Sequence, residues 1–477
     1  MLEIIKKIIP VKLFRLLQPP YHFLMAGLAS LAYRFPSERL VVIGVTGTAG
    51  KTSTAYLIYR LLSEAGYKSG LTSTALIADG EKEWLNDRKM TMPGRFFIQR
   101  LLRQMRANGC SYAVIETTSE GIKQFRHRFI NYDVLVFTGI YPEHIESHGS
   151  FEKYKAAKEK LFAHLKNCRT KYVDETRQVV RPGSELRKLD LTRLEKTIIV
   201  NGDDEHAFDF LSYWSEAKIA YSLDSAAETE VFRRRLSSDA GAAGFRLVRG
   251  GIAAADATGT EIIADEHEIK LHLLGSFNAA NALAAYAVGL NQGLTPERIK
   301  AGLEQVRGMA GKMEMIEAGQ DFLVMVDYSF EPRALEKLYE TIDAVPHNRL
   351  IQVLGSTGGG RDRPRRPVLG RMAAEKADIV IITDEDPYDE DPAQIINQVA
   401  AGAEMAGKVP NQDLYKILDR KEAITKAMSL AEAGDLVLLT GKGAEQYICL
   451  ARGRKLPWDE REVARAILVD KLWVDKA

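Results

Sequence analysis

Residues 41–65 read VVIGVTGTAGKTSTAYLIYRLLSEA, and this stretch decides the fold. An apolar run of strand length, 41–45, enters a turn with several glycines, after which apolar residues repeat with the period of a helix. A strand, a glycine loop and a helix in this order place backbone N–H groups around a phosphate at the positive end of the helix. Lys51 can add a positive charge there and Thr52 a hydroxyl for Mg²⁺, so the stretch predicts a nucleoside triphosphate site. Val45 stands where the usual spacing has its first glycine, and a glycine turn that only closes a βα unit is the alternative.

The composition is typical of a soluble globular protein with two or three domains. The 477 residues are 46% hydrophobic and 27% charged, and a formal net charge of +1 gives no electrostatic reason to expect nucleic acid as a partner. Cys110, Cys168 and Cys449 are far apart in the sequence, so they suggest neither a disulfide framework nor a thiolate metal site. No stretch approaches the roughly 20 apolar residues that a membrane span needs. We therefore expect a cytoplasmic protein.

The start of the chain differs from the rest, because residues 1–35 combine several basic residues with many apolar ones. Such a segment can lie in a membrane interface, so the sequence predicts peripheral membrane contact through residues 1–35. The alternative is a pair of helices, broken at Pro19 and Pro20, that packs on the first domain. A cleaved signal peptide is disfavoured because the strand at 41–45 begins only a few residues later.

Strand-like runs at 67–72, 112–116 and 133–138 extend the first strand into a parallel sheet. In such a sheet the carboxyl ends of the strands face the ligand crevice, so residues that follow the strands are candidates for chemistry. Glu116 ends one strand, and His144 follows another within the segment EHIESHG. We expect both to serve one Mg²⁺ site, although imidazole is an unusual ligand for this ion and a single histidine is more often structural.

The helix expected at 154–165 carries several lysines, including Lys158. By charge pattern alone these lysines form a solvated face. Nothing in the pattern distinguishes Lys158 from its neighbours.

The region after this helix contains short alternating segments, which predict a partly antiparallel extension of the sheet with turns at 201–202 and 250–251. An alanine-rich helix follows at 279–290, with Asn278 and Asn281 at its start. These asparagines either cap the helix or hydrogen-bond a purine base.

A second α/β unit follows, in which strand-like runs alternate with helical segments and so indicate another parallel sheet. The runs lie at 322–328, 350–354, 378–383 and 435–440, and the helices at 332–342, 392–405 and 420–432. The predicted fold class is α/β, with a central P-loop-type ATPase domain built on a parallel sheet and a C-terminal Rossmann-like α/β domain. The expected bounds are 1–38 for a basic amphipathic helical segment, 39–308 for the central domain and 309–477 for the C-terminal domain.

Polar segments again follow the strands of this second unit. They read GSTGGGRDRPRRP at 355–367, DEDPYDED at 384–391 and GKGAE at 441–445. Arginine forks suit carboxylates and an acidic cluster suits an amine, so a crevice with both would suit an amino acid. Solvated charged loops are the alternative, above all for 389–391.

A series of motifs matches a known family in the order of the chain. They are GTAGKT at 47–52, ETTS at 116–119, EHIESHG at 143–149, YKAAKEKLF at 154–162, GSFNAAN at 275–281, DY at 327–328, GRDRPRRP at 360–367 and GKGAE at 441–445. In these residues the chain resembles the Mur ligases, and among them the UDP-N-acetylmuramoyl-tripeptide synthetases of the MurE type, which add the third residue of the peptidoglycan stem peptide. Several ordered motifs are much more specific than one glycine loop.

The resemblance implies an acid–amino-acid ligase that uses ATP and Mg²⁺, forms ADP and phosphate, and activates the peptide carboxylate as an acyl phosphate. The implied ATP-binding residues are Gly47, Thr48, Ala49, Gly50, Lys51, Thr52, Ser53, Asn281 at the adenine, and Asp327. The implied metal residues are Thr52, Glu116, His144 and Lys158, the last as a carbamate, and the implied catalytic residues are Lys51, His144, Lys158 and Asp327. The muramyl peptide would meet Thr91, Met92, Pro93, Thr118, Ser119 and Arg126, and the free amino acid would meet Arg361, Glu385, Asp386, Tyr388, Gly441 and Glu445.

The chain departs from the family pattern in its residues at three places. Ala49 and Gly139 each stand where the family has an asparagine, which would lower activity or mark a divergent branch. The segment EDPY at 385–388 stands where diaminopimelate-adding members have DNPR. Loss of that arginine and gain of Asp386 favour a cationic side chain, such as lysine or ornithine, on the incoming amino acid.

The family's separate amino-terminal domain, which holds the uridine nucleotide, is expected to be missing, because only residues 1–40 precede the first strand. The acceptor is then either a UDP-linked muramyl peptide that is gripped differently, or a lipid-linked one that the basic start of the chain meets at the membrane. Two other functions stay open: a folylpolyglutamate-synthase-like or other peptide ligase, and a nucleotide-binding scaffold whose catalysis has decayed. The ETTS and GKGAE segments favour the MurE type.

Overall fold

The strand that leads into the glycine loop, β1 (Val41–Thr46), lies inside an 11-stranded sheet. The computed structural model describes residues 11–143, 148–180, 191–223, 245–360 and 363–474. β1 pairs in parallel with β5 (Tyr112–Glu116) and with β6 (Val134–Phe137), and all three strands are fully buried. Their carboxyl ends therefore reach the same edge of the sheet, as predicted.

The strand order across this large sheet is β14-β13-β12-β11-β10-β6-β1-β5-β2-β3-β4. Strands β12 to β2 in this order are parallel, whereas the last two pairings at each edge are antiparallel, which confirms the predicted partly antiparallel extension. The other strands are β2 (Ser69–Thr72), β3 (Leu76–Ala78), β4 (Glu83–Leu85), β10 (Thr197–Asn201), β11 (Ala217–Ser222), β12 (Phe245–Asp256), β13 (Gly259–Ala264) and β14 (His267–Leu271). A small sheet beside it consists of β7 (Tyr172–Val173), β8 (Val179–Val180) and β9 (Thr192–Arg193).

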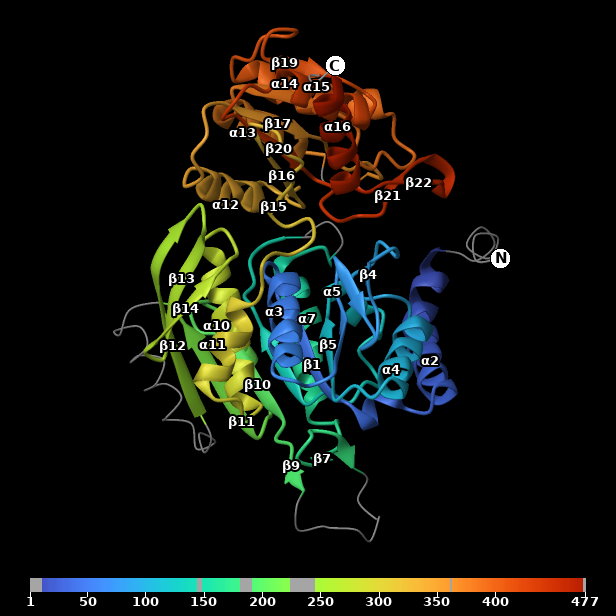
Figure 1. The fold of residues 1–477 in the computed structure, drawn as a ribbon. Coiled ribbons are helices and arrows are strands. Elements are labelled where there is room, and N and C mark those ends of the chain that lie inside the picture. The colour runs from blue at the N-terminus through green and yellow to red at the C-terminus, as the bar shows by residue number, and fades with distance from the viewer. Residues whose placement is uncertain (1–10, 144–147, 181–190, 224–244, 361–362, 475–477) are drawn as a thin grey trace.

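Helices cover both faces of the large sheet, and each face has its own apolar core (Figure 1). One face carries α3 (Lys51–Glu64), α10 (Phe277–Asn291) and α11 (Pro296–Glu304). The other carries α4 (Arg95–Ala107), α5 (Ser119–Lys123), α7 (Phe151–Leu165) and α8 (Ala207–Leu211). A sheet buried on both sides explains why its strands read as continuous apolar runs.

The C-terminal domain repeats this plan on a six-stranded sheet of order β15-β16-β20-β17-β18-β19, in which only the pairing of β15 with β16 is antiparallel. The strands are β15 (Glu314–Met315), β16 (Leu323–Asp327), β17 (Leu350–Leu354), β18 (Ile379–Ile382), β19 (Leu414–Lys416) and β20 (Leu436–Thr440). α12 (Pro332–Ile342), α13 (Arg365–Lys376) and α14 (Pro392–Met405) pack on one face, and α15 (Arg420–Leu430) and α16 (Glu460–Val474) on the other. The short elements are η1 (Pro36–Arg39), β21 (Tyr447–Cys449), η2 (Ala451–Gly453) and β22 (Lys455–Pro457).

The amino-terminal helix is continuous, so the expectation of a helical pair broken at Pro19 and Pro20 is wrong. Both prolines lie inside α2 (Val11–Ala32). A proline has no N–H, so the carbonyl four residues before each proline lacks its helical partner. Both prolines are exposed, so water can bind these carbonyls. α2 packs on α4 of the central domain and buries Ala29 and Ser30. None of the helices in the described part of the chain is long and apolar enough to span a bilayer.

The pair Gly250-Gly251 does not form the predicted turn. Both glycines lie inside β12, opposite Ala264 and Ile263 of β13. A Cβ at Gly250 would come 2.7 Å from Leu283 Cδ2, so this glycine lets α10 approach the strand closely.

A buried ion pair fixes the carboxyl ends of two strands in the C-terminal domain. The Arg420 guanidinium, at the start of α15, lies 2.6 Å from Glu460 Oε1, and both side chains are almost fully buried. The same guanidinium donates to the carbonyls of Asp384 and Thr440, which follow β18 and end β20. The pair therefore holds the strand ends where the predicted amino-acid site begins.

Candidate active site

The glycine loop is closed by contacts that leave no room for larger residues. Gly50 precedes α3 with φ +76°, and a Cβ there would lie 2.5 Å from Asn281 Oδ1. A Cβ at Gly47 would collide with Thr138 Oγ1. Gly44, which falls one residue early for the usual spacing, packs instead against Tyr132 and Leu135 inside the sheet. The loop geometry thus depends on Gly47 and Gly50.

Two lysines, Lys51, which is partly buried, and Lys158, which is buried, bind carbonyls of this loop. Lys51 Nζ donates to the Thr48 carbonyl over 2.5 Å, and Lys158 Nζ donates to the Gly47 carbonyl over 2.5 Å. Burial lowers the pKa of Lys51, and the Glu116 carboxylate partly offsets this effect. Burial also lowers the pKa of Lys158 well below its usual range, and the neighbouring Lys51 ammonium lowers it further. Both effects favour the uncharged form of Lys158 relative to a lysine in water.

The charge pattern of α7 was misleading for Lys158. Its side chain is 1% exposed, so the solvated face expected there is wrong for this lysine, whereas Lys153, Lys160 and Lys166 are exposed. Lys158 shares its buried helix face with Tyr154, Leu161 and Leu165. These four residues follow one another at spacings of four, three and four. Because the other three are apolar or aromatic, this spacing indicates a buried helix face that includes Lys158.

An oxygen-rich cluster lies at the ends of β2 and β5. Thr52 Oγ1 donates to Glu116 Oε1 over 3.0 Å, and the Thr74 backbone N–H donates to Glu116 Oε2 over 2.7 Å. Hydroxyl and carboxylate oxygens are the donors that Mg²⁺ prefers, so Thr52 and Glu116 fit this ion. His144 lies outside the described residues. Within those residues no group of three or more His, Cys, Asp or Glu side chains is placed to bind a metal.

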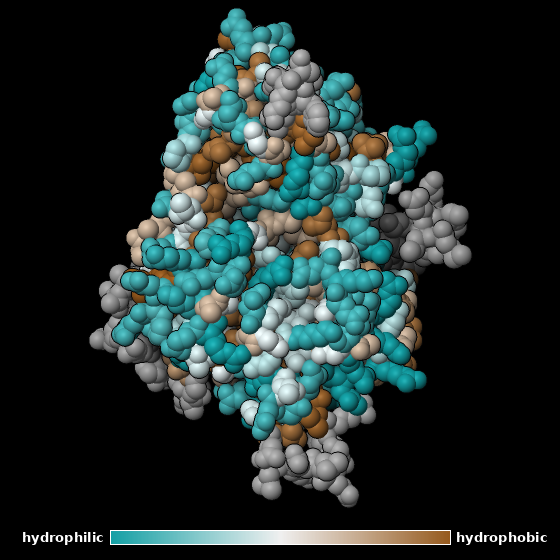
Figure 2. Space-filling model, in the orientation of Figure 1, coloured by the Kyte–Doolittle hydropathy of each residue, from teal (hydrophilic) through white to brown (hydrophobic). Residues whose placement is uncertain are grey.

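A cavity of about 610 Å³ opens beside the glycine loop, at the junction of the two domains. Figure 2 shows the surface hollowed between the upper and lower parts of the molecule, with apolar side chains among hydrophilic ones. A volume of this size suits a small ligand such as a nucleotide. The central domain lines it with Ala49, Gly50, Ser53, Asn278 and Asn281, among others, and the C-terminal domain with Lys312, Asp327, Arg333 and Lys337.

Neither asparagine caps α10, so the capping interpretation is wrong. The residue before this helix is Ser276, and Asn278 Nδ2 donates to the Leu274 carbonyl. Asn281 Oδ1 accepts from Thr54 Oγ1 over 3.2 Å, and Asn281 Nδ2 donates to Asn278 Oδ1. These bonds hold the Asn281 amide against α3 at the wall of the cavity, and its contact with adenine stays a prediction.

Contacts between the domains border the same cavity. The Arg333 guanidinium of α12 lies 4.5 Å from the centre of the Tyr141 ring in the central domain. Asp327 ends β16, and its carboxylate accepts from the backbone N–H groups of Met313 and Ser329. Asp327 therefore fixes the chain where it enters the second domain.

The residues predicted to meet the muramyl peptide gather near Thr91. Thr91 Oγ1 lies 2.8 Å from Thr74 Oγ1, and the Met92 carbonyl accepts from the Arg126 guanidinium. Thr118 caps α5 by accepting from the Gly121 N–H, and Ser119 Oγ lies 3.1 Å from His148 Nε2. Pro93 precedes Gly94, the residue before α4. Of these residues, Thr91 is joined through Thr74 to the oxygen cluster at Glu116.

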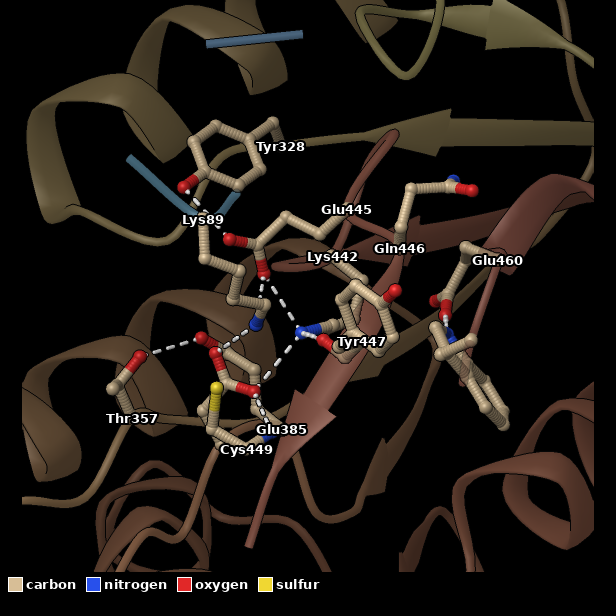
Figure 3. A network of polar contacts seen from close by, with 12 residues as sticks. Lys89, Tyr328, Thr357, Glu385, Lys442, Glu445, Gln446, Tyr447, Cys449 and Glu460 are labelled. Carbon is tan, nitrogen blue, oxygen red and sulfur yellow. Dashed lines mark hydrogen bonds and ion pairs between the residues drawn. The ribbon is translucent and has the colours of Figure 1, made fainter. Parts of the chain in front are cut away.

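Three of the residues predicted to meet the amino acid, Glu385, Asp386 and Glu445, belong to one polar group in the C-terminal domain (Figure 3). Glu445 Oε2 accepts from Lys442 over 2.7 Å and from Lys89 over 2.9 Å. Asp386 accepts from the same two lysines and from the Cys449 N–H. The carboxylates that sequence reasoning assigned to a substrate amine and a cationic side chain therefore hold ammonium groups of the chain itself.

The remaining members of this set lie around the two carboxylates. Glu385 is buried, which raises the pKa of its carboxyl, and its Oε2 has no hydrogen-bond partner among the described residues. Gly441 has φ +103°, and a Cβ there would lie 2.6 Å from that oxygen. Tyr388 donates its backbone N–H to the Cys449 carbonyl, and Arg361 lies outside the described residues.

Comparison with known proteins decides the family. Residues 45–181 and 186–289 match the Mur ligase middle domain, and residues 311–443 match the domain described as Mur ligase, glutamate ligase domain. A UDP-N-acetylmuramyl-tripeptide synthetase of Roseiflexus sp. (strain RS-1) is 38% identical over 467 residues, which are 97% of this chain and 84% of the relative. The chain belongs to the Mur ligase family.

Other similarities agree with this family. A UDP-N-acetylmuramoyl-L-alanyl-D-glutamate–2,6-diaminopimelate ligase of Halalkalibacterium halodurans is 32% identical over 451 residues, 94% of this chain and 82% of the relative. Mycobacterium tuberculosis folylpolyglutamate synthase, complexed with ADP and AMPPCP, has a similar fold, with a TM-score of 0.60 and 16% identity over 87% of this chain and 91% of that one. Mur ligases are ATP-dependent, Mg²⁺-requiring amide ligases of peptidoglycan synthesis that form ADP, so this chain is an ATP-dependent ligase, as predicted.

The two asparagine replacements of this Mur ligase have local structural partners. Gly139 has φ +121°, and a Cβ there would lie 3.0 Å from Asp204 Oδ2, which accepts from the Ile140 N–H. The Ala49 carbonyl accepts from Thr138 Oγ1 over 2.6 Å. An asparagine at 139 would therefore be strained in this chain.

Sequence reasoning missed Thr74 and Lys89. Thr74 follows β2 at its carboxyl end, so the rule that found Glu116 would have found it. Lys89 contacts residues far away in the sequence, and no local pattern identifies it.

Replacing Gly50 by alanine should weaken ATP binding at least about tenfold, because the new Cβ would press on Asn281 Oδ1 and push the loop from the cavity. Gly66 is the matched control, since it has φ +85° and a Cβ added there would have no atom of the described residues within 4 Å. Both substitutions should lower the free energy of unfolding by about 1 kcal/mol in urea, but only Gly50→Ala should raise the Kd of a fluorescent ATP analogue. Equal nucleotide binding by the two variants would contradict this placement of ATP.

Proposed function

We propose that this Mur ligase joins an amino acid to the carboxylate of a muramyl peptide, through an acyl phosphate made from ATP. One observation carries the proposal: two sites open toward the junction of the same two domains. The first is the glycine loop with its bound lysines, and the second is the pocket whose carboxylates hold ammonium groups of the chain. The names of the two relatives, a muramyl-tripeptide synthetase and a diaminopimelate ligase, support a muramyl peptide as the acceptor.

In the proposed reaction a peptide carboxylate oxygen attacks the γ-phosphorus of ATP, and the bond from that phosphorus to the bridging oxygen breaks to release ADP. The amine then attacks the acyl carbon, loses a proton and displaces phosphate. The Lys51 ammonium offsets the negative charge on the transferring phosphoryl group. Thr52, Glu116, His144 and Lys158 would hold Mg²⁺, which when bound screens the charge of the phosphates. Closure of the domain junction keeps water from the acyl phosphate.

The other roles implied by the resemblance are part of this proposal. The nucleotide lies along Gly47 to Ser53, with Asn281 at the adenine and Asp327 near the junction. The peptide meets Thr91, Met92, Pro93, Thr118, Ser119 and Arg126, and the amino acid meets Arg361, Glu385, Asp386, Tyr388, Gly441 and Glu445. The proposed parts of the chain are 1–38, 39–308 and 309–477.

For the incoming amino acid we propose a cationic side chain, such as that of lysine or ornithine. Asp386 and Glu445 support this choice, because each carboxylate accepts from two ammonium groups in the structure. Tyr388 brings no positive charge to the position where diaminopimelate-adding relatives have arginine, so a second carboxylate on the amino acid would lack that partner.

The decisive experiment is mass spectrometry of the products after incubation with ATP, Mg²⁺, UDP-muramoyl-dipeptide and a pool of amino acids. We expect an acceptor heavier by one amino acid residue. Lys51→Ala should lower the rate of product formation at least about 100-fold, because the transferring phosphoryl group loses its counter-charge. Lys300→Ala removes a lysine that pairs with Glu304 on the surface and should leave the rate unchanged. Glutamate addition to a folate in place of the muramyl product would favour the folylpolyglutamate-type alternative. No product with a folate, a UDP-linked or a lipid-linked muramyl peptide would favour a scaffold.

We also propose that Lys158 carries a carbamate. The lowered pKa of Lys158 supports an uncharged Nζ. This nitrogen attacks the carbon of CO₂ and forms an N–C bond, while one C=O double bond of CO₂ opens to give the carboxylate. The nitrogen then loses a proton. An anion would then replace a cation next to the predicted metal residues.

After incubation with ¹³C-bicarbonate, the wild-type protein should give a carbamate carbon signal by NMR that Lys158→Met lacks. The signal should strengthen as the pH rises through the lowered pKa of Lys158, because the protonated ammonium has no lone pair to react. Lys155→Met, on the same helix but paired with Asp209, should keep the signal. An unchanged signal in Lys158→Met would rule out the carbamate at this residue.

A further part of the proposal is that α2 places the enzyme on an anionic membrane surface, where a lipid-linked muramyl peptide would be the acceptor. The side chains of Leu17, Tyr21, Leu24, Leu28 and Leu31 are 45–62% exposed and repeat every three or four residues. The helical period puts this row opposite the buried residues that pack on α4. The neighbouring α4 exposes Arg100, Arg103 and Arg106, which suit acidic lipid headgroups.

In flotation with phosphatidylglycerol-containing vesicles, the wild-type chain should bind and the double variant Leu24→Asn, Leu28→Asn should bind more than about tenfold less, because two apolar anchors are lost. Met405→Asn is the control, since Met405 is 88% exposed in the other domain and should not matter. Failure of the wild-type protein to float, or equal flotation of all three proteins, would refute membrane contact through α2.

A further inference from the structure

Lys89 reaches from the central domain into the polar group of the C-terminal domain (Figure 3). Its Nζ lies 2.6 Å from Asp386 Oδ2 and 2.9 Å from Glu445 Oε2, and its side chain is 9% exposed. Burial alone would lower the pKa of Lys89, but the carboxylates of Glu445 and Asp386 outweigh it and raise the pKa. Lys89 is therefore a charged group that ties the two domains together at the predicted amino-acid pocket.

Two lysines share these carboxylates, but they are held differently. Lys442 is fully buried, and its ammonium binds Asp386, Glu445 and the Tyr447 carbonyl, which all belong to its own domain. This lysine stays in place whatever the other domain does. The Lys89 ammonium is held across the junction, so a movement of one domain relative to the other can withdraw it.

The loop that presents Lys89 also carries the residues predicted to meet the muramyl peptide. The backbone at Lys89 has φ +51°, a conformation that a lysine rarely adopts, and Thr91 follows two residues later. Thr91 contacts Thr74, whose hydroxyl and N–H bind Glu116 at the predicted metal site. A short segment thus connects the acid pair in one domain with the acceptor and metal residues in the other.

We propose that Lys89 is an internal occupant of the amino-acid pocket, whose ammonium takes the place on Asp386 and Glu445 that an ammonium group of the incoming amino acid takes during the reaction. This inference rests on the proposed function, because it identifies the pocket with the amino-acid site. With Lys89 present, two carboxylates face two ammonium groups. Without it, one negative charge has no partner in buried surroundings, which is costly.

Displacement of Lys89 has two consequences for the reaction. The amino acid must compete with a tethered ammonium, so its apparent affinity is reduced by the fraction of molecules in which Lys89 fills the pocket. Only an amino acid whose side chain brings an ammonium group to Asp386 and Glu445 restores the charge balance. The pocket therefore selects against amino acids without a cationic side chain. Release of Lys89 also frees its loop, so amino-acid entry is transmitted to Thr91 and Met92.

The test is isothermal titration of the free, full-length protein with L-lysine and with L-ornithine. Lys89→Met should bind at least one of the two about tenfold more tightly than the wild type, because the internal competitor is gone and the acid pair seeks a counter-charge. Lys89→Arg keeps a cation at the pocket and should not gain affinity. Lys82→Met, which removes an exposed lysine before the same loop, is the matched control and should bind as the wild type does.

Equal or weaker binding of both amino acids by a folded Lys89→Met protein, including no binding at all, would overturn the inference. Thermal unfolding of each variant establishes that it is folded, and Asp386→Asn with Lys89 intact should bind more weakly than the wild type. Failure of the proposed function would appear separately, as absence of an amide product from the wild-type enzyme.

Discussion

The bonds that Lys51 and Lys158 donate to carbonyls of one glycine loop are the interaction on which the rest of the site depends. Positive charge on both lysines at once is disfavoured by burial and by their mutual repulsion, and backbone carbonyls only partly compensate it. The loop can hold this arrangement because Gly47 and Gly50 keep their places against Thr138 and Asn281. A polyphosphate, a carboxylate ligand or a carbamate each lowers the repulsion, so the site favours negative charge where phosphoryl transfer needs it.

The C-terminal domain presents the opposite arrangement, with anions that are held in place and cations that compensate them. Its parallel strands end at Asp327, at the segment with Asp386, and at Thr440 before Glu445. The Arg420–Glu460 pair holds two of these ends, so the carboxylates have fixed positions. Because strand ends of both sheets meet at one junction, the edge predicted to bind phosphate faces the edge whose carboxylates hold ammonium groups of the chain. That pairing is what an enzyme needs to bring an activated acid to an amine.

The sequence predicted the parts of this fold that depend on local pattern. The strands 112–116 and 350–354 and the helices 332–342 and 392–405 follow from buried runs and from apolar periodicity, and the structure has them at the same residues. The family resemblance named Lys158, but charge patterning did not distinguish it, because that pattern treats lysines alike whereas packing buries one of them. Gly250 was misread because a close helix contact and a turn use glycine equally. Lys89 lies 297 residues from Asp386, and a contact of that range has no trace in local spacing.

The two missing asparagines bear on whether catalysis has decayed in this chain. If they had been lost without constraint, their positions would tolerate many residues. Instead Gly139 adopts a backbone conformation suited to glycine beside the Asp204 carboxylate, and Asp204 itself binds the next N–H of the chain. The Ala49 carbonyl is held by Thr138, the residue whose hydroxyl also excludes a side chain at Gly47. The backbone at both positions is thus held in place, and the conformation of Gly139 accounts for glycine at that position. This arrangement favours a divergent, working branch of the family, because a decayed site has no reason to keep its loop closed so tightly.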